Sequence, residues 1–278
     1  MPAPNSLAEH VQRHYSAGGL TDRILAALAD AGKDVDRLIP EDLAPIDEFH
    51  IRGREATMEL GRAVGLDEGK HVLDVGSGVG GPSRCIAQTF GCRVTGVDLT
   101  DDYCRAATML AQRVGLADLV TYRQGDALDL PFANDSFDVV WTQHAAMNIK
   151  EKVTLYREMG RVLKPGGSLA IYDILAGPSG DVIFPVPWAR SAETSFLAEP
   201  GEMRELIESA GLTISSWIDT TAAAREWFTG LAKKIQQSGL PKLGFHVLLG
   251  SDFQAMAQNQ RRNLEENRIV LVQITATK

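Results

Sequence analysis

Cysteine is scarce in this sequence, and the patterns that cysteines form in secreted or metal-binding proteins are missing. The three cysteines, Cys85, Cys92 and Cys104, are odd in number and show neither CxxC pairs nor Cys/His ligand spacing. Such thiols are typical of reduced, packed side chains, so we expect a cytoplasmic protein without a metal site. The first ten residues lack a basic segment followed by an apolar core, so no signal peptide is expected there.

Long hydrophobic runs and an excess of positive charge are missing as well. No apolar run reaches the roughly 18 to 20 residues that a membrane span needs, so no membrane association is expected. The chain carries 28 Lys and Arg against 36 Asp and Glu, a formal net charge of -8. That balance argues against a nucleic acid as the main partner, because binding a polyanion requires a basic surface.

From residue 70 onward the sequence alternates short β-branched runs with helix-period segments. The β-branched runs are "HVLDV", "CRVTGVD", "LVTYRQ", "FDVVWTQ" and "SLAIYDI". Helical patterns lie between most of them, which predicts βαβ units and a mainly parallel sheet covered by helices on both faces. "KPGG" at 164–167 is expected to end a helix and lead into the fifth strand.

The segments on either side of this alternating region differ from it in hydrophobic periodicity and composition. Residues 1–55 read as a helical cap, and residues 176–198 as a long loop rich in Pro, Gly and aromatic residues. A loop of that length in a compact domain is usually functional. Two further helices and a last strand, "RIVLVQITAT", follow. We therefore predict a single domain over 1–278, with the cap at 1–55, a core at 56–175, and a loop, an insertion and the last strands at 176–278.

The densest motif is the glycine loop "VLDVGSGVGGPSRCIA" at 72–87, which follows the first strand and opens a helix. It satisfies the G-x-G-x-x-G pattern of dinucleotide sites, where a ligand approaches the backbone closely. Asp74 lies two residues before the first glycine, and Asp98 and Asp126 end the second and third strands. A carboxylate beside the loop disfavours a pyrophosphate and favours a cation, and one at Asp98 can accept both ribose hydroxyls. S-adenosylmethionine, a cation without phosphate, therefore fits better than NAD.

Four ordered motifs, "LDVGSGVGG", "GVDLT", "GDALDLPFANDSFDVV" and "RVLKPGG", together resemble class I S-adenosylmethionine-dependent methyltransferases over 70–175. The resemblance implies an α/β fold with a doubly wound, mostly parallel seven-stranded sheet whose last strand is antiparallel. The N-terminal helical cap and a helical insertion before the last strand complete the predicted fold. By motif match, the methionine moiety would lie at Asp74, Gly76 and Gly78, the ribose at Asp98, and the adenine at Asp126 and Ala127. The predicted cofactor site comprises Asp74, Gly76, Ser77, Gly78, Asp98, Leu99, Asp126, Ala127 and Gln143.

The flanking motifs "HYSAGGLTDRILAAL", "HIRG" and "FPVPWAR" resemble the small-molecule branch of that family, which includes sarcosine/dimethylglycine methyltransferases. This resemblance implies N-methylation of a small amine or amino acid such as sarcosine or dimethylglycine. A C- or O-methyltransferase of a quinone precursor or secondary metabolite stays open, and a deep aromatic pocket without a carboxylate clamp would favour it. A nicotinamide-dependent oxidoreductase is the remote alternative. The expected partner is a small-molecule substrate, and a homo-oligomer stays open.

Candidate residues for the reaction itself lie where an open sheet places ligands, at the carboxyl ends of its strands. His144 after the fourth strand and Tyr15 in the cap are the predicted catalytic residues, and a histidine near neutrality can act as a general base. A packed histidine bonded to a carbonyl is the alternative for His144. Related phosphoethanolamine enzymes carry a histidine where this chain has Asn148, so the predicted base moves to His144. The predicted substrate-binding residues are His50, Arg52, Asn148, Trp188 and Arg190.

Overall fold

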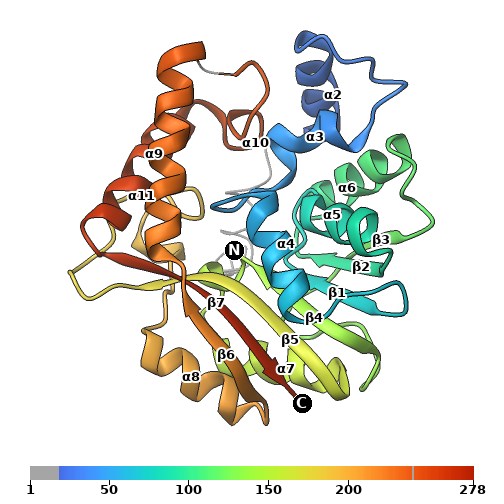
Figure 1. The fold of residues 1–278 in the computed structure, drawn as a ribbon, viewed down its shortest axis with the longest axis vertical. Helices are drawn as coiled ribbons and strands as arrows, with labels where there is room; N and C mark the ends of the chain where they lie inside the picture. The colour runs from blue at the N-terminus through green and yellow to red at the C-terminus, as the bar shows by residue number, and fades with distance from the viewer. Residues whose placement is uncertain (1–18, 240) are drawn as a thin grey trace, which may run out of the picture.

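The computed structural model describes residues 19–239 and 241–278 and is built on a seven-stranded sheet (Figure 1). The strand order is β3-β2-β1-β4-β5-β7-β6. Neighbouring strands from β3 to β5 run parallel, and β7 runs antiparallel to both β5 and β6. This topology confirms the predicted α/β fold with an antiparallel last strand. The strands are β1 (His71–Val75), β2 (Arg93–Asp98), β3 (Val120–Gln124), β4 (Phe137–Gln143), β5 (Leu163–Ala176), β6 (Thr213–Asp219) and β7 (Ile269–Thr277).

Both faces of the sheet are buried, because successive residues of a strand point to opposite sides. On β1, Val72 packs with Leu60 and Ile86 in one hydrophobic cluster, whereas Leu73 packs with Leu155 in the other. Alternate residues of a strand therefore supply the cores of two helical layers. The helices of these layers include α4 (Arg54–Ala63), α5 (Gly81–Phe90), α6 (Asp101–Arg113), α7 (Lys152–Val162) and α8 (Pro200–Ser209).

The N-terminal cap and the C-terminal insertion meet at one end of the molecule (Figure 1). The cap contributes α2 (Leu20–Asp30) and α3 (Pro40–Asp47), and the insertion contributes α9 (Thr221–Ser238), α10 (His246–Leu249) and α11 (Phe253–Glu265). Helix α10 contacts α2, and the rings of Phe49 and Phe245 lie 5.0 Å apart between their centroids. Two segments about 200 residues apart in the chain thus pack directly on one another.

Two boundaries differ from the sequence-based expectations. Strand β5 begins at Leu163, so "KPGG" lies within it and does not precede it. The turn is absorbed as an irregularity in the pairing with β4, where Phe137 pairs with Leu163 but Val139 pairs with Ser168. The backbone of Gly166 and Gly167 is hydrogen-bonded to Lys278, which extends the strand. Strand β3 ends at Gln124, two residues before Asp126.

Candidate functional site

A cavity of about 460 Å³ lies at the carboxyl ends of β1, β2 and β4, under the cap and the insertion. Its walls come from segments that lie far apart in the sequence: the glycine loop, the ends of the three strands, the 176–198 loop and helices α9 to α11. This is the position that the open α/β sheet reserves for ligands. The predicted cofactor residues Gly76, Ser77, Gly78, Asp98, Leu99, Asp126, Ala127 and Gln143 line it.

Two glycines of the glycine loop, Gly76 and Gly78, are required for different reasons. Gly76 has a φ of 79°, and a Cβ added there would lie 2.4 Å from the Cβ of Ala145. Gly78 also has a positive φ, 52°, but an added Cβ would meet no atom within 4 Å. Gly76 is therefore required by the packing of the protein itself, whereas the space over Gly78 is open to a ligand. Ser77 between them has a buried hydroxyl with no hydrogen-bond partner among the described residues.

Asp98, at the end of β2, is held in place by the backbone. Its Oδ2 accepts a hydrogen bond from the Gly78 N–H at 2.9 Å, and its Oδ1 accepts one from the Thr100 N–H at 2.8 Å. Each carboxylate oxygen keeps a further lone pair that can accept a hydroxyl. A fixed carboxylate with this spare capacity fits the two hydroxyls of a ribose.

Asp74 lies behind the glycine loop, and it is not among the cavity-lining residues. It is 1% exposed and accepts a hydrogen bond of 2.6 Å from the Ser83 hydroxyl. Burial raises the pKa of Asp74 to about 7, although the bond from Ser83 opposes the shift. This position supports the loop from beneath, and direct contact with a methionine moiety stays a prediction.

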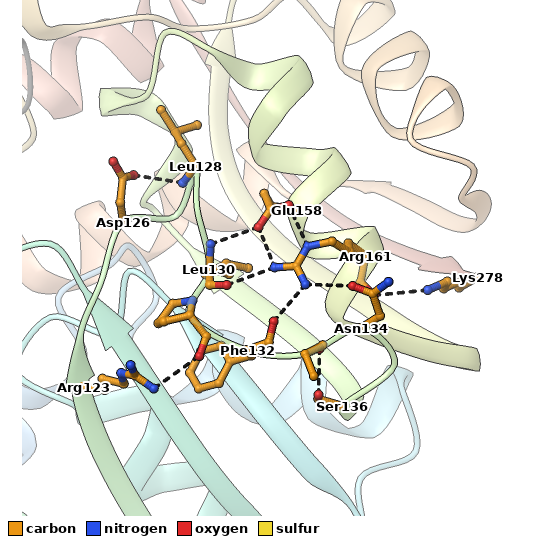
Figure 2. A network of polar contacts seen from close by, with 12 residues as sticks. Arg123, Asp126, Leu128, Leu130, Phe132, Asn134, Ser136, Glu158, Arg161 and Lys278 are labelled. Atoms are coloured by element: carbon orange, nitrogen blue, oxygen red, sulfur yellow. Dashed lines mark hydrogen bonds and ion pairs between the residues drawn. The ribbon is translucent and has the colours of Figure 1, made fainter.

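The loop after β3, which carries Asp126 and Ala127, is fastened by the side chains of Arg123 and Arg161 (Figure 2). Arg161 on α7 donates hydrogen bonds to the carbonyl oxygens of Leu130 and Phe132, at 2.9 and 2.8 Å. Glu158 pairs with Arg161 and accepts a bond from the Leu130 N–H at 3.0 Å. The loop therefore presents Asp126 and Ala127 to the cavity from a rigid frame.

The cap is joined to α5, the helix that follows the glycine loop, by a buried ion pair. Arg84 of α5 donates a 2.5 Å hydrogen bond to Asp47 at the end of α3. Burial raises the pKa of Asp47 to about 6, and the charge of Arg84 opposes the rise. A Cβ added at Gly81 would lie 1.7 Å from the Asp47 carbonyl oxygen, so only glycine permits this approach.

Three consecutive polar residues at the end of β4 line the cavity: Thr142, Gln143 and His144. Each has a buried polar atom without a hydrogen-bond partner among the described residues, namely Oγ1, Nε2 and Nε2 respectively. His144 has a φ of 48°, and its ring stacks on Tyr172 with 5.3 Å between centroids. Burial lowers the pKa of His144 well below its ordinary value, and His50 lowers it further. Burial therefore favours the neutral imidazole of His144, and it disfavours the protonated form.

His50 lines the cavity and belongs to a buried network behind His144. Its Nε2 lies 2.9 Å from the Glu48 carboxylate, and its ring centroid lies 5.8 Å from that of His144. The Thr57 hydroxyl donates to Glu48 at 2.8 Å. Burial raises the pKa of Glu48, but hydrogen bonds from His50 and Thr57 outweigh it and leave the pKa below the ordinary value.

The remaining predicted substrate residues divide into two groups. Asn148 and Trp188 line the cavity, and the Asn148 amide donates to the Trp188 carbonyl at 2.7 Å, which ties the 176–198 loop to β4. Arg52 and Arg190 are not cavity-lining: Arg52 forms a double hydrogen bond with Glu59, and Arg190 pairs with Asp252 at the surface. The geometry gives no support to a substrate clamp made by these arginines. Tyr15 lies outside the described residues.

Sequence reasoning missed most of the aromatic wall on the far side of the cavity. Besides Trp188, the wall contains Phe49, Trp227, Phe228, Phe245 and Phe253. These residues come from the cap and the insertion, where aromatic residues at helical spacing read as ordinary core. The one available signal was their density in segments outside the βαβ core.

Comparison with known proteins agrees with this geometry. Residues 73–171 match the family model described as "Methyltransferase domain". The methyltransferase GfsG of Streptomyces halstedii is 33% identical over 187 residues, which cover 66% of this chain and 67% of that protein. The sterol 24-C-methyltransferase ERG6B of Gibberella zeae is 39% identical over 116 residues, but the chain spans only 30% of its length.

Solved structures of methyltransferases share the fold. Geranyl diphosphate C-methyltransferase of Streptomyces coelicolor A3(2), solved with S-adenosyl-L-homocysteine, superposes with a TM-score of 0.71 at 18% identity, covering 99% of both chains. Phosphoethanolamine N-methyltransferase 2 of Haemonchus contortus, solved with S-adenosyl-L-methionine, gives 0.75 at 20% identity, covering 98% of this chain and 60% of that one. The relatives therefore methylate different kinds of atom, and the sarcosine/dimethylglycine branch is not singled out.

Within residues 19–239 and 241–278, no helix combines the length and apolar character needed to cross a membrane. The same residues contain no group of three or more side chains placed to hold a metal ion. The fold, the glycine loop and the matched relatives all agree: the chain belongs to the class I S-adenosylmethionine-dependent methyltransferases, enzymes that use S-adenosylmethionine as cofactor.

Proposed function

We propose that this methyltransferase acts on an apolar small molecule of the secondary-metabolite kind, and not on an amino-acid amine. The observation that carries this proposal is the wall of the cavity beyond His144. It is built from six aromatic side chains: Phe49, Trp188, Trp227, Phe228, Phe245 and Phe253. Aromatic side chains offer large apolar contact areas, so this wall suits a bulky hydrocarbon skeleton.

The charges around the cavity support the same conclusion. A carboxylate substrate such as sarcosine is best held by an arginine fork, and no arginine lines the cavity among the described residues. The two arginines considered from the sequence, Arg52 and Arg190, are already paired with Glu59 and Asp252. Among the described residues, the amine hypothesis therefore lacks an arginine fork, and Lys150 is the lysine that lines the cavity.

The residues at the mouth of β4 suit the chemistry of the reaction. Bound S-adenosylmethionine supplies a methyl group on a positively charged sulfur, which an acceptor atom displaces in line. Orientation of the reacting atoms is the main contribution that a protein can make to such a step, of roughly 7 to 11 kcal/mol. His144 would act as the general base for the proton of the acceptor. Because burial lowers its pKa, we expect a contribution below the roughly 10² to 10⁴-fold of a base with a pKa near neutrality. The glycine loop and Asp98 would hold the cofactor.

The test is a comparison of acceptors with the purified protein. Formation of S-adenosylhomocysteine is measured with sarcosine and dimethylglycine, and with a panel of hydroxylated aromatic, isoprenoid and macrolactone compounds. We expect turnover with members of the apolar panel and background rates with the amino acids. Turnover of sarcosine or dimethylglycine with none of the apolar compounds would overturn the proposal.

A variant of the wall provides a second measurement. Phe245→Ala should raise the KM of the apolar acceptor about tenfold, because an acceptor that covers this partly buried ring gains roughly 1.5 to 2 kcal/mol of apolar contact. The affinity for S-adenosylhomocysteine should be unchanged, since Phe245 belongs to the insertion and not to the glycine loop. Equal losses in both affinities would show that this wall does not define an acceptor site.

A further inference from the structure

The orientation of the Gln143 amide is fixed by its neighbours. The indole Nε1–H of Trp141 donates a 2.9 Å hydrogen bond to Oε1 of Gln143, and the Thr57 hydroxyl lies 3.1 Å from the same oxygen. An indole N–H can only donate, so the oxygen of the amide must face Trp141. The NH₂ group therefore faces the other way, and its Nε2 is buried without a partner among the described residues. Gln143 is 7% exposed and lines the cavity.

His144 lies on the same face of the sheet as Gln143, although adjacent residues of a strand normally alternate. Its φ of 48° breaks the alternation. Its ring stacks on Tyr172, which is the register partner of Gln143 on β5 and so shares its face. His50 confirms the arrangement, because it lies edge-on to the His144 ring at 5.8 Å while its Nε2 lies 3.2 Å from the Thr57 hydroxyl beside Gln143.

Two neighbouring residues of the cavity lining thus lie on one face of the sheet, and each has a buried nitrogen without a partner among the described residues. Nε2 of Gln143 offers N–H groups. We assign the proton of a neutral His144 to Nδ1, which leaves a lone pair on its unpartnered Nε2. Buried polar atoms of this kind are rarely left unpaired, and a ligand that pairs both explains why they persist. A hydroxyl group is complementary to both at once, since its oxygen accepts one bond while its proton is donated in the other.

Resting on the proposed function, we infer that the methylated atom of the apolar acceptor is a hydroxyl oxygen held between Gln143 and His144. A hydroxyl oxygen has two lone pairs, so one can accept from Gln143 while the other attacks the methyl group. A neutral amine has a single lone pair, which a hydrogen bond from Gln143 would block. An alkene carbon has no lone pair and would leave both side chains unpaired.

The step balances with the groups named. The hydroxyl oxygen forms a bond to the methyl carbon while the carbon–sulfur bond breaks, and the electron pair of that bond goes to sulfur. The hydroxyl proton goes to Nε2 of His144. The products are a methyl ether, neutral S-adenosylhomocysteine and a protonated His144, which returns its proton to solvent. Gln143, which the sequence predicts as a cofactor residue, is in this inference a positioning residue for the acceptor and orients the attacking lone pair.

The first experiment uses the wild-type protein and identifies the methylated atom. A turned-over apolar acceptor is treated with S-adenosylmethionine carrying a deuterated methyl group, and the product is analysed by NMR and mass spectrometry. A methyl ether supports the inference. A C- or N-methyl product overturns it while leaving methylation of an apolar acceptor intact, and the absence of any methylated apolar acceptor refutes the proposed function itself.

The second experiment uses Gln143→Glu, which keeps an oxygen for Trp141 and Thr57 but replaces the donor by a second acceptor. We expect kcat/KM for the acceptor to fall about tenfold to a hundredfold, the usual effect of an unpaired buried group. The affinity for S-adenosylhomocysteine, measured by calorimetry, should change less than twofold. Gln112→Glu, the same substitution on an exposed turn of α6, should change neither quantity. An unchanged kcat/KM in Gln143→Glu, or an equal loss of cofactor affinity, would overturn the role of Gln143.

Discussion

Replacing Gly78 by alanine separates the cost of backbone strain from the loss of a ligand site. Gly78 and Gly65 share a left-handed backbone, with φ of 52° and 61°, and an added Cβ meets nothing within 4 Å at either position. They differ in place, since Gly78 lines the cavity and Gly65 does not. Gly65→Ala is therefore a matched control for Gly78→Ala.

The strain should be equal in the two variants. An alanine in the left-handed region costs about 1 kcal/mol, which lowers the Tm of a chain of this size by roughly 2 to 4 °C. S-adenosylhomocysteine at a hundred times its Kd should stabilise the wild type and Gly65→Ala by about 2.7 kcal/mol. If the methyl group at residue 78 weakens binding about a hundredfold, the same ligand concentration stabilises Gly78→Ala by only about 0.4 kcal/mol.

Thermal denaturation with and without S-adenosylhomocysteine measures both quantities on one sample. A ligand-induced shift in Gly78→Ala equal to that of Gly65→Ala would refute the assignment of the open space over Gly78 to the cofactor. Gly76→Ala provides the opposite contrast. Its Cβ would lie 2.4 Å from that of Ala145, so it should lose more stability than either variant even without ligand.

Two further predictions concern buried charge. Burial raises the pKa of Asp74 from 3.8 to about 7, so its contribution to stability is full below about pH 4 and is lost as the pH rises through 7. Urea unfolding between pH 5 and 8.5 should therefore show a flatter pH dependence in Asp74→Asn, by about 3 kcal/mol at 1.36 kcal/mol for each pH unit between 5 and 7. An unaltered slope would contradict this. Asp47→Asn leaves the buried Arg84 charge uncompensated and should destabilise the protein by about 3 to 5 kcal/mol in the same assay. Asp101 pairs with Arg105 at the surface, so the control variant Asp101→Asn should leave the urea midpoint unchanged.

The sheet was predictable from the sequence, and so was the side of the cavity formed by the glycine loop and the strand ends, because both follow from local patterns. The run "FDVVWTQ" coincides with β4, Phe137–Gln143, since its apolar residues satisfy two buried faces. In a parallel sheet the carboxyl ends of neighbouring strands meet at one edge, so Asp98 and Asp126 could be brought to one site without knowledge of the fold in detail. Both line the same cavity.

The side of the cavity formed by the cap and the insertion depends on contacts between segments that are distant in the sequence, and no local pattern predicts such contacts. Arg52 and Arg190 looked available for a substrate because the sequence does not show that Glu59 and Asp252 reach them. Likewise Phe49 and Phe245 meet across almost 200 residues of chain, at 5.0 Å between ring centroids. The contact between Phe49 and Phe245 arises from the packing of the cap on the insertion. The sequence alone does not distinguish a hydrophobic residue that packs in the core from one that contacts a ligand.

His144 shows how a single backbone angle decides what a polar cluster can do. The sequence predicts polar residues where β4 leaves the sheet, and period-two alternation would place Gln143 and His144 on opposite faces. A left-handed residue other than glycine costs about 1 to 2 kcal/mol, and histidine is among the side chains found there more often than average. With a φ of 48°, His144 turns back onto Tyr172 and joins Gln143 on one face of the sheet. In a strand end with regular alternation, the Gln143 amide and the His144 ring would lie on opposite faces of the sheet. The left-handed backbone of His144 is therefore what allows both side chains to approach one oxygen atom.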